Sequence, residues 1–341
     1  MVVEFERNRR YHTILAGLAA ALAGFCLIAL SVGRYSMNPA DVIRVLVERI
    51  TDTTPSDYAM HNVVFIIRIP RIAAAILVGA SLSLSGAVYQ GVFKNPLVSP
   101  DLLGVSSGAC VGAAIAILGG GGMSMIQISA FAMGMIAVSI SVAITRVLRS
   151  DSNMALVLAG IVTSGFMTSV LGILKYVADP ETQLAEIVFW QMGSVASVNR
   201  AQMLAVLPVF IICGSLLLAL SWRINILSFG EDEAKTLGMN VPLFRGIVIA
   251  CASFLTASAV SISGTIGWIG LVIPHLGRLL TGPNNTKLLP VTILLGGLFM
   301  LIVDTLSRAA MSVEIPLSIL TGIIGAPFFA WLLWRQREAV R

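Results

Sequence analysis

Apolar residues run along the chain in long blocks that short polar segments separate. An α-helix needs about 20 mainly apolar residues to cross roughly 30 Å of hydrocarbon. Ten blocks approach that length, and each predicts a membrane-spanning helix. They cover roughly residues 13–33, 71–92, 102–119, 124–147, 154–177, 202–221, 244–263, 266–281, 288–306 and 316–334. The pattern predicts an all-α, polytopic membrane protein that forms one transmembrane domain over residues 1–341.

Composition agrees with this class. The 341 residues are 57% hydrophobic and only 11% charged, whereas soluble domains carry about 25% charged residues. The first apolar run, residues 13–33, is longer than the 7–15-residue core of a cleaved signal peptide. We therefore interpret it as an uncleaved first span. The four cysteines lie in apolar segments without metal-ligand spacing and are interpreted as small packing residues.

The distribution of basic residues predicts the orientation. Ten spans place both termini on one side, and cytoplasmic loops are enriched in lysine and arginine. With the N-terminus inside, fourteen of the 22 basic residues fall on inside segments and eight on outside segments. We expect both termini to be cytoplasmic.

Three polar segments have helical character of their own. Residues 38–50 alternate apolar and charged positions and predict an amphipathic helix on the outer surface. Residues 179–201 are similar, with Phe189 and Trp190 as interfacial aromatics. The inside loop 228–242 begins its helix with acidic residues and has Gly238 at its end. This loop helix is either structural or a docking element for a cytoplasmic partner.

Motifs of covalent chemistry do not occur in the sequence. It contains neither H-E-x-x-H nor G-x-S-x-G, and no Gly-Lys dipeptide of a phosphate-binding loop. We expect no catalytic residues, no metal site and no ATPase site in this chain. Few charges lie inside the spans, and Lys175, Asp304 and Arg308 lie near span ends. That distribution disfavours an ion-coupled carrier, which usually has a polar site near the midplane.

The stretch from Arg68 to Gly104 combines charged ends with a run of small residues. Arg68 and Arg71 would share a helix face at the outer end. Small residues let helices pack closely, and they also suit the wall of a pathway. A second unusual stretch has glycines every third residue before a proline and is a poor regular helix. Its residues are Gly264, Gly267, Gly270, Pro274 and His275.

Four sequence blocks resemble the FecCD-type permeases, the membrane subunits of ATP-binding-cassette (ABC) importers for ferric siderophores, haem and cobalamin. The blocks are RIPR at 68–71, SGAVYQGVFKNPLVSPDLLG at 85–104, GTIGWIGLVIPHLGR at 264–278 and EIPLSILTGIIGAPFF at 314–329. The acidic loop that ends in Leu237-Gly238 matches the family as well. They occur in the family's order over nearly the whole chain. Ser318 stands where the family usually has glycine.

The resemblance implies a type II ABC importer permease in a prokaryotic inner membrane. It implies a homodimer with two cytoplasmic P-loop ATPase subunits and an external solute-binding protein. The chain itself would bind no cofactor, and ATP with magnesium would sit on the partner ATPase. The cargo would be a metal chelate, with a ferric siderophore first, haem or cobalamin close, and an oxyanion such as molybdate as the alternative.

The resemblance also implies roles for residues at matching positions. Arg68, Arg71 and Arg308 would dock the binding protein, and Gly264, Gly267, Gly270, Pro274, His275, Pro316, Gly325 and Pro327 would be structural motif positions. The loop residues that would couple to the ATPase are Glu231, Asp232, Glu233, Ala234, Leu237 and Gly238. The gate and pathway residues would be Ser85, Gly86, Asn95, Pro96, Leu97, Ser152 and Asn153.

Overall fold

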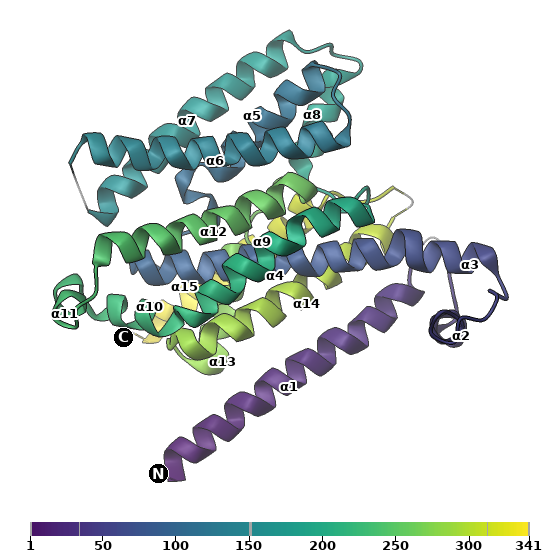
Figure 1. The fold of residues 1–341 in the computed structure, drawn as a ribbon, viewed down its shortest axis with the longest axis horizontal. Helices are drawn as coiled ribbons and strands as arrows, with labels where there is room; N and C mark the ends of the chain where they lie inside the picture. Colours follow the sequence, from purple (N-terminus) through teal and green to yellow (C-terminus); the bar gives the residue numbers. More distant parts are fainter. Residues whose placement is uncertain (1, 34, 150–151, 312, 340–341) are drawn as a thin grey trace.

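The computed structural model describes residues 2–33, 35–149, 152–311 and 313–339, and Figure 1 shows the fold. Over these residues the chain is helical and contains no strand. Arg34 and Arg341, which the charge distribution includes, lie outside the described residues. The elements are α1 (Val2–Ser31), α2 (Pro39–Ile50), α3 (Tyr58–Asn62), a π-helical turn η1 (Val63–Arg68), α4 (Ile69–Phe93), a 3₁₀ turn η2 (Pro100–Leu103), α5 (Val105–Leu118), α6 (Met123–Val147), α7 (Asn153–Val177), α8 (Gln183–Met192), α9 (Arg200–Ala219), α10 (Ser221–Phe229), α11 (Glu231–Thr236), α12 (Val241–Ser263), α13 (Ile269–Thr281), α14 (Asn285–Ala309) and α15 (Leu317–Ala339).

The predicted spans correspond to helices of the fold. Seven helical segments in the described residues are long and apolar enough to cross a membrane. Three shorter apolar helices, Val105–Leu118, Ile269–Thr281 and Leu317–Leu332, accompany them. Each of the ten predicted segments overlaps one of these, which confirms the polytopic all-α class.

Helix α4 is the central helix of the chain. It packs against α14, α12, α13 and α9, and every residue from Val78 to Gln90 is buried. Small residues permit this packing: a Cβ on Gly79 would lie 2.2 Å from the Gly296 carbonyl oxygen, and one on Gly86 would lie 2.0 Å from that of Gly270. Close helix packing therefore explains the small residues of α4. The other interpretation, a pathway wall, is compatible with this packing and stays a prediction.

Two further parts of the chain lie on opposite sides of this centre (Figure 1). Helices α5, α6, α7 and α8 pack on one another on one side, and α12 connects them to α4. On the opposite side α1 packs mainly along α14 and leaves most of its own surface exposed. A helix so poorly covered and so apolar is surrounded by lipid in a membrane protein.

Two spans are short because irregular backbone precedes them. Residues 94–99 and η2 lead into α5, and residues 264–268 lead into α13. The two breaks meet, since a Cβ on Gly270 would lie 2.3 Å from Pro100 Cδ. Non-helical backbone at membrane depth is tolerated where protein surrounds it. The glycine-rich stretch thus starts α13 at Ile269, three residues later than predicted.

Candidate functional site

The three arginines predicted to dock a binding protein lie close together at one end of the bundle, but they are buried. Arg68 is 4% exposed, and Arg71 and Arg308 are each 6% exposed. The expectation that these side chains face outward from the surface is therefore wrong for this conformation. Each guanidinium is instead bonded within the chain, because a buried charge needs partners.

Arg71 is held by two carboxylates. Its Nε donates to Asp304 Oδ1 at 2.9 Å, on the neighbouring helix α14. Its Nη1 and Nη2 donate to the two carboxylate oxygens of Glu314 at 2.8 and 3.0 Å, a bidentate fork. Glu314 lies in the connection between α14 and α15. Arg71 therefore ties three segments together.

Arg68 and Arg308 bond to the end of α1. Arg68 donates to the carbonyls of Leu30 and Tyr35, and Arg308 Nη2 donates to the Ala29 carbonyl at 2.5 Å. The last carbonyls of a helix lack partners in their own helix, and these side chains supply them. Arg308 Nε also lies 3.8 Å from Asp304 Oδ2, so Asp304 links Arg308 to Arg71. Arg68, at the end of η1, is connected to Arg308 through the end of α1 that both side chains bond.

Sequence reasoning missed the acidic members of this cluster as partners. Asp304 was placed near a span end, where a long side chain can reach water, yet it is fully buried. Its position four residues before Arg308 in one helix was an available signal. The only sequence signal for Glu314 was its place as the first residue of the block EIPLSILTGIIGAPFF at 314–329.

At the other end of the bundle, the two predicted gate loops are brought together. Asn95, Pro96 and Leu97 are exposed after α4 ends at a left-handed Lys94. Asn95 Oδ1 accepts the Leu97 N–H at 2.9 Å, which turns the loop locally. Asn153 Nδ2 donates to the Val92 carbonyl at 3.3 Å, and Ser152 caps α7. The start of α7 is thus bonded to the end of α4.

Gln90 anchors the first of these loops, and it was not predicted. Its Nε2 donates to the carbonyls of Val98 and Gly270, each at 3.2 Å. Arg278 Nη2 donates to its Oε1 at 2.5 Å. One buried amide therefore connects the loop after α4 with both ends of α13. The glutamine of the quoted motif was its only sequence signal.

Ser85 and Gly86 do not belong to the exposed loops. Ser85 Oγ donates to the Ala252 carbonyl of α12 at 2.9 Å, and Gly86 packs on Gly270. Both are buried contacts of α4. Both residues therefore contribute to helix packing within the chain, and their role as gate or pathway residues stays a prediction.

The acidic loop forms the short helix that the sequence predicted. α11 covers Glu231–Thr236 and stops before Gly238, whose φ of 75° is the left-handed conformation that glycine favours. Glu231 pairs with Arg245 of α12, and Ala234 is fully buried. Asp232, Glu233 and Leu237 remain exposed. The helix thus has a fixed base and a free outer surface.

The glycine-rich stretch and the last span meet at Trp268. Trp268 has φ +72°, and a Cβ on Gly325 of α15 would lie 2.6 Å from its Cβ. Ser318, where the family usually has glycine, donates its hydroxyl to the Thr265 carbonyl. Position 264 has no room for a side chain, since a Cβ there would lie 2.1 Å from the Trp190 carbonyl oxygen. These contacts position α13 and α15.

The other motif positions have simpler surroundings. Pro274 is buried within α13, and His275 beside it is half-buried. Pro316 immediately precedes α15, Pro327 is exposed within α15, and nothing lies within 4 Å of a Cβ placed on Gly267.

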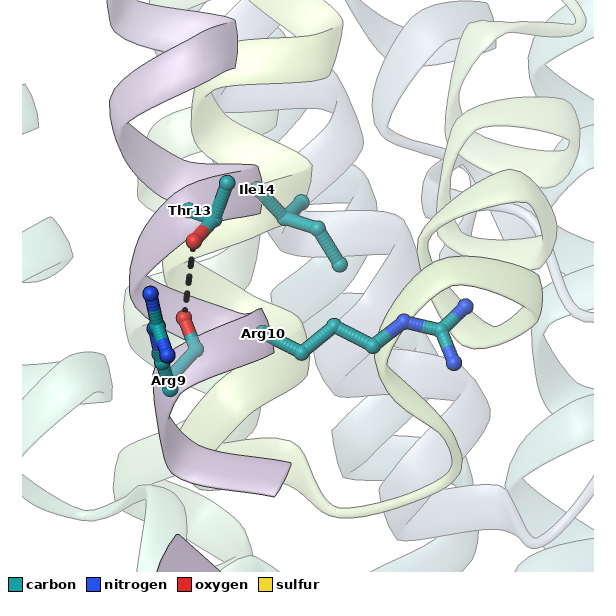
Figure 2. Close-up of a pocket in the computed structure, with 4 residues that line it drawn as sticks. All are labelled: Arg9, Arg10, Thr13 and Ile14. Carbon is teal, nitrogen blue, oxygen red and sulfur yellow. Dashed lines mark hydrogen bonds between the residues drawn. The ribbon is translucent and has the colours of Figure 1, made fainter. Parts of the chain in front are cut away.

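Open hollows occur along the N-terminal half of α1. One of about 900 Å³ is lined by small and polar residues from Asn8 to Ala20. A second of about 360 Å³ is lined by Arg9, Arg10, Thr13 and Ile14 (Figure 2). In Figure 2 the Thr13 hydroxyl donates to the Arg9 carbonyl at 3.0 Å, and Arg10 extends away from both. Both hollows lie on a single helix, so they do not form the convergent polar site that a bound cargo needs.

Similarity to known proteins identifies the family of this chain. The model of the FecCD transport family matches residues 21–335. The molybdate import system permease protein MolB of Haemophilus influenzae is 41% identical over 96% of this chain and 97% of its own. A Helicobacter pylori permease assigned to an iron chelatin transport system is 43% identical over 82% of this chain and 84% of its own.

A solved structure has the same fold. It is an inward-facing conformation of an ABC transporter assigned to the metal-chelate type, with a TM-score of 0.86 and 40% identity over 95% of this chain and 99% of that one. The chain therefore belongs to the FecCD transport family, the multi-pass membrane permeases of ABC importers.

Proposed function

We propose that this chain is the transmembrane subunit that carries a metal chelate across the inner membrane, with a ferric siderophore as the first candidate and haem or cobalamin next. The observation that carries this proposal is the full-length fold agreement with a transporter assigned to the metal-chelate type. Two copies would form the pathway between them. Both termini would lie in the cytoplasm.

ATP hydrolysis by a partner subunit would supply the energy. The exposed side of α11 supports this, because Asp232, Glu233 and Leu237 stand on a helix whose base is fixed through Glu231 and Ala234. A rigid helix that protrudes from the bundle can transmit a conformational change of a bound partner to the spans. Phe229 and Leu237 add exposed apolar contact area next to it, at 82% and 67% exposure.

In alternating access, one end of the bundle would open while the other end closes. The loops at Asn95–Leu97 and Ser152–Asn153 would form the inner gate, since they are exposed at one end and joined through Val92. A ligand can shift such an equilibrium only if it binds the two states with different affinity. ATP and the external binding protein would favour different states.

Molybdate import is the second candidate. It is favoured by one observation, the 41% identity to a molybdate permease over nearly the entire length of both chains. An oxyanion is much smaller than a siderophore complex. The two cargoes therefore require pathways of different width.

Reconstitution into liposomes separates these functions. The chain is combined with its partner ATPase and a binding protein, and uptake of labelled ferric siderophore, haem, cobalamin and molybdate is measured with and without ATP. ATP-dependent uptake of an iron chelate supports the first proposal, and selective uptake of molybdate replaces it with the second. Uptake that an ion gradient alone drives would refute the importer mechanism.

A further inference from the structure

Helix α2 has three distinct faces. At 3.6 residues per turn, successive side chains are about 100° apart around the axis. Val42 and Val45 share one face and are buried. Asp41, Arg44 and Glu48 share a second face, and Ile43, Val47 and Ile50 share a third. The faces are roughly 100–140° apart.

The protein covers only the first face. Val42 and Val45 pack in one cluster with Ala29 and Leu30 of α1 and with Val64 of η1. Ile43, Val47 and Ile50 are left 53%, 50% and 84% exposed. A strip of branched aliphatic side chains on an otherwise polar connection is costly in water.

The polar face is satisfied within its own segment. Asp41 Oδ1 accepts from Arg44 Nη2 at 2.7 Å, and Glu48 Oε2 accepts from the Ser56 N–H at 3.2 Å. These groups need no partner beyond water. The two exposed faces of α2 therefore suit two different media, one aqueous and one apolar.

The position of α2 fits a membrane boundary. It follows α1 after a connection of seven residues and packs on the end of that helix. Figure 1 shows α2 nearly end-on, whereas α1 and α4 extend across the view, so α2 lies across the spans. The neighbouring turn of α1 also exposes Leu27 and Ile28, at 48% and 50%, on a span that lipid surrounds. Exposed apolar side chains thus occur both on α2 and on the end of α1 against which α2 packs.

We propose that α2 is an interfacial helix that inserts Ile43, Val47 and Ile50 into the lipid of the outer leaflet and holds the end of α1 at the membrane surface. Helices with this division of faces lie in the interface plane with the apolar side about 5–10 Å into the headgroup region. A protein partner suits the strip less well, because three side chains cover far less than the roughly 800 Å² per side of a stable interface. The proposal depends on the membrane location of the family and is independent of the cargo.

Collisional accessibility of spin labels tests this insertion. Single cysteines replace the strip residues (Ile43→Cys, Val47→Cys, Ile50→Cys), and Arg44→Cys and Glu48→Cys serve as matched controls on the polar face of the same helix. The full chain is placed in phosphatidylethanolamine–phosphatidylglycerol vesicles. Collisions with molecular oxygen, which partitions into lipid, are compared with collisions with a water-soluble nickel chelate. The unsubstituted chain sets the background from the native cysteines.

We expect labels on the strip to lose nickel collisions and gain oxygen collisions relative to labels at positions 44 and 48. Equal nickel accessibility on both faces would place the strip in water and overturn the proposal. Loss of both collision partners at 43, 47 and 50 would mean that protein covers the strip, which also overturns it. The measurement needs neither transport nor ATP, so it can fail while the importer function stands.

Discussion

Arg71 and Asp304 are separated by 233 positions in the sequence and bonded at 2.9 Å in the fold. Asp304 is fully buried, and Arg71 is 6% exposed. The pair joins α4 to α14 at the same end of the bundle where Arg68 and Arg308 hold α1. The arginines expected to bind another protein are therefore already bonded within this chain.

Asp304→Ala should destabilise the chain strongly. Breaking a buried ion pair leaves an uncompensated charge, which costs about 3–5 kcal/mol; Glu314 remains as a second partner, so we expect the lower part of that range. The measurement is the thermal unfolding midpoint of the purified chain in detergent. Asp41→Ala is the control, because its pair with Arg44 is exposed and should contribute less than about 1 kcal/mol. Equal losses for both variants would contradict a buried pair at Arg71.

Glu314→Gln should strengthen docking of the external binding protein if Arg71 is a docking residue. Glu314 engages two nitrogens of Arg71, and its side chain is 29% exposed. An acidic residue on the binding protein would compete with it for the same guanidinium. We expect tighter binding by up to about tenfold, equivalent to 1.4 kcal/mol, in a titration at low salt.

Glu181→Gln is the matched control for charge. Glu181 is exposed on a segment expected on the same outer side, so its substitution removes the same negative charge from that side without freeing Arg71. Unchanged affinity for Glu314→Gln, together with reduced thermal stability, would assign Arg71 a structural role alone.

Gly79→Ala should destabilise the contact between α4 and α14. The added Cβ would lie 2.2 Å from the Gly296 carbonyl oxygen and 2.4 Å from Met300 Cβ, and overpacking a core typically costs about 1–3 kcal/mol. Gly24→Ala in α1 is the control, because nothing lies within 4 Å of a Cβ at that position. There the better helix propensity of alanine should stabilise slightly. Thermal unfolding in detergent compares the two, and similar midpoints would show that the helices can separate at no cost.

Gln90→Leu should impair transport and loosen the loop after α4. The substitution removes both bonds from Nε2, to Val98 and Gly270, and the acceptor for Arg278. Each lost bond of a buried group costs about 1–3 kcal/mol, and the loop after α4 loses its anchor. We expect lower ATP-dependent uptake and faster modification of a cysteine at Leu97 by a water-soluble maleimide. Gln183→Leu loses a 3.4 Å bond to the Leu118 carbonyl and the acceptor for the exposed Asp179 N–H at 3.1 Å, neither of which involves the loop after α4. It should leave both readouts near wild type, and equal changes in the two variants would reject the anchor role.

The connection from α2 to α3 should loosen in acid. The hydrogen bond from Ser56 lowers the pKa of the Glu48 carboxyl below its ordinary value. A carboxyl with a lowered pKa in the folded state stabilises the fold above its unfolded pKa of about 4.3, and this contribution disappears as the pH falls through the folded value. The protection of the Ser56 amide against hydrogen exchange, relative to an unstructured peptide at the same pH, should therefore fall below about pH 4. Glu48→Gln should remove this pH dependence, and exchange that follows the same pH profile in both proteins would contradict it.

The membrane class, the positions of the spans and the short helices were predictable because each depends on neighbouring residues. Apolar length alone identifies a span. The periodicity of residues 38–50 was sufficient for α2, and the acidic start with Gly238 was sufficient for α11. The family, too, could be recognised from motifs that are continuous in the sequence.

Only the tertiary structure decided which of the predicted sites are exposed. The run of small residues in α4 suited both packing and a pathway wall, and the contacts of Gly79 and Gly86 with other helices show the packing. The pathway role stays a prediction. Likewise, an arginine at a span end can reach water or a buried carboxylate. For Arg71 the outcome depends on two carboxylates that lie 233 and 243 positions away in the sequence. For Arg278 it depends on the Gln90 amide, which lies 188 positions away. Local periodicity carries no information on such distant pairs, because they come together only when the helices pack.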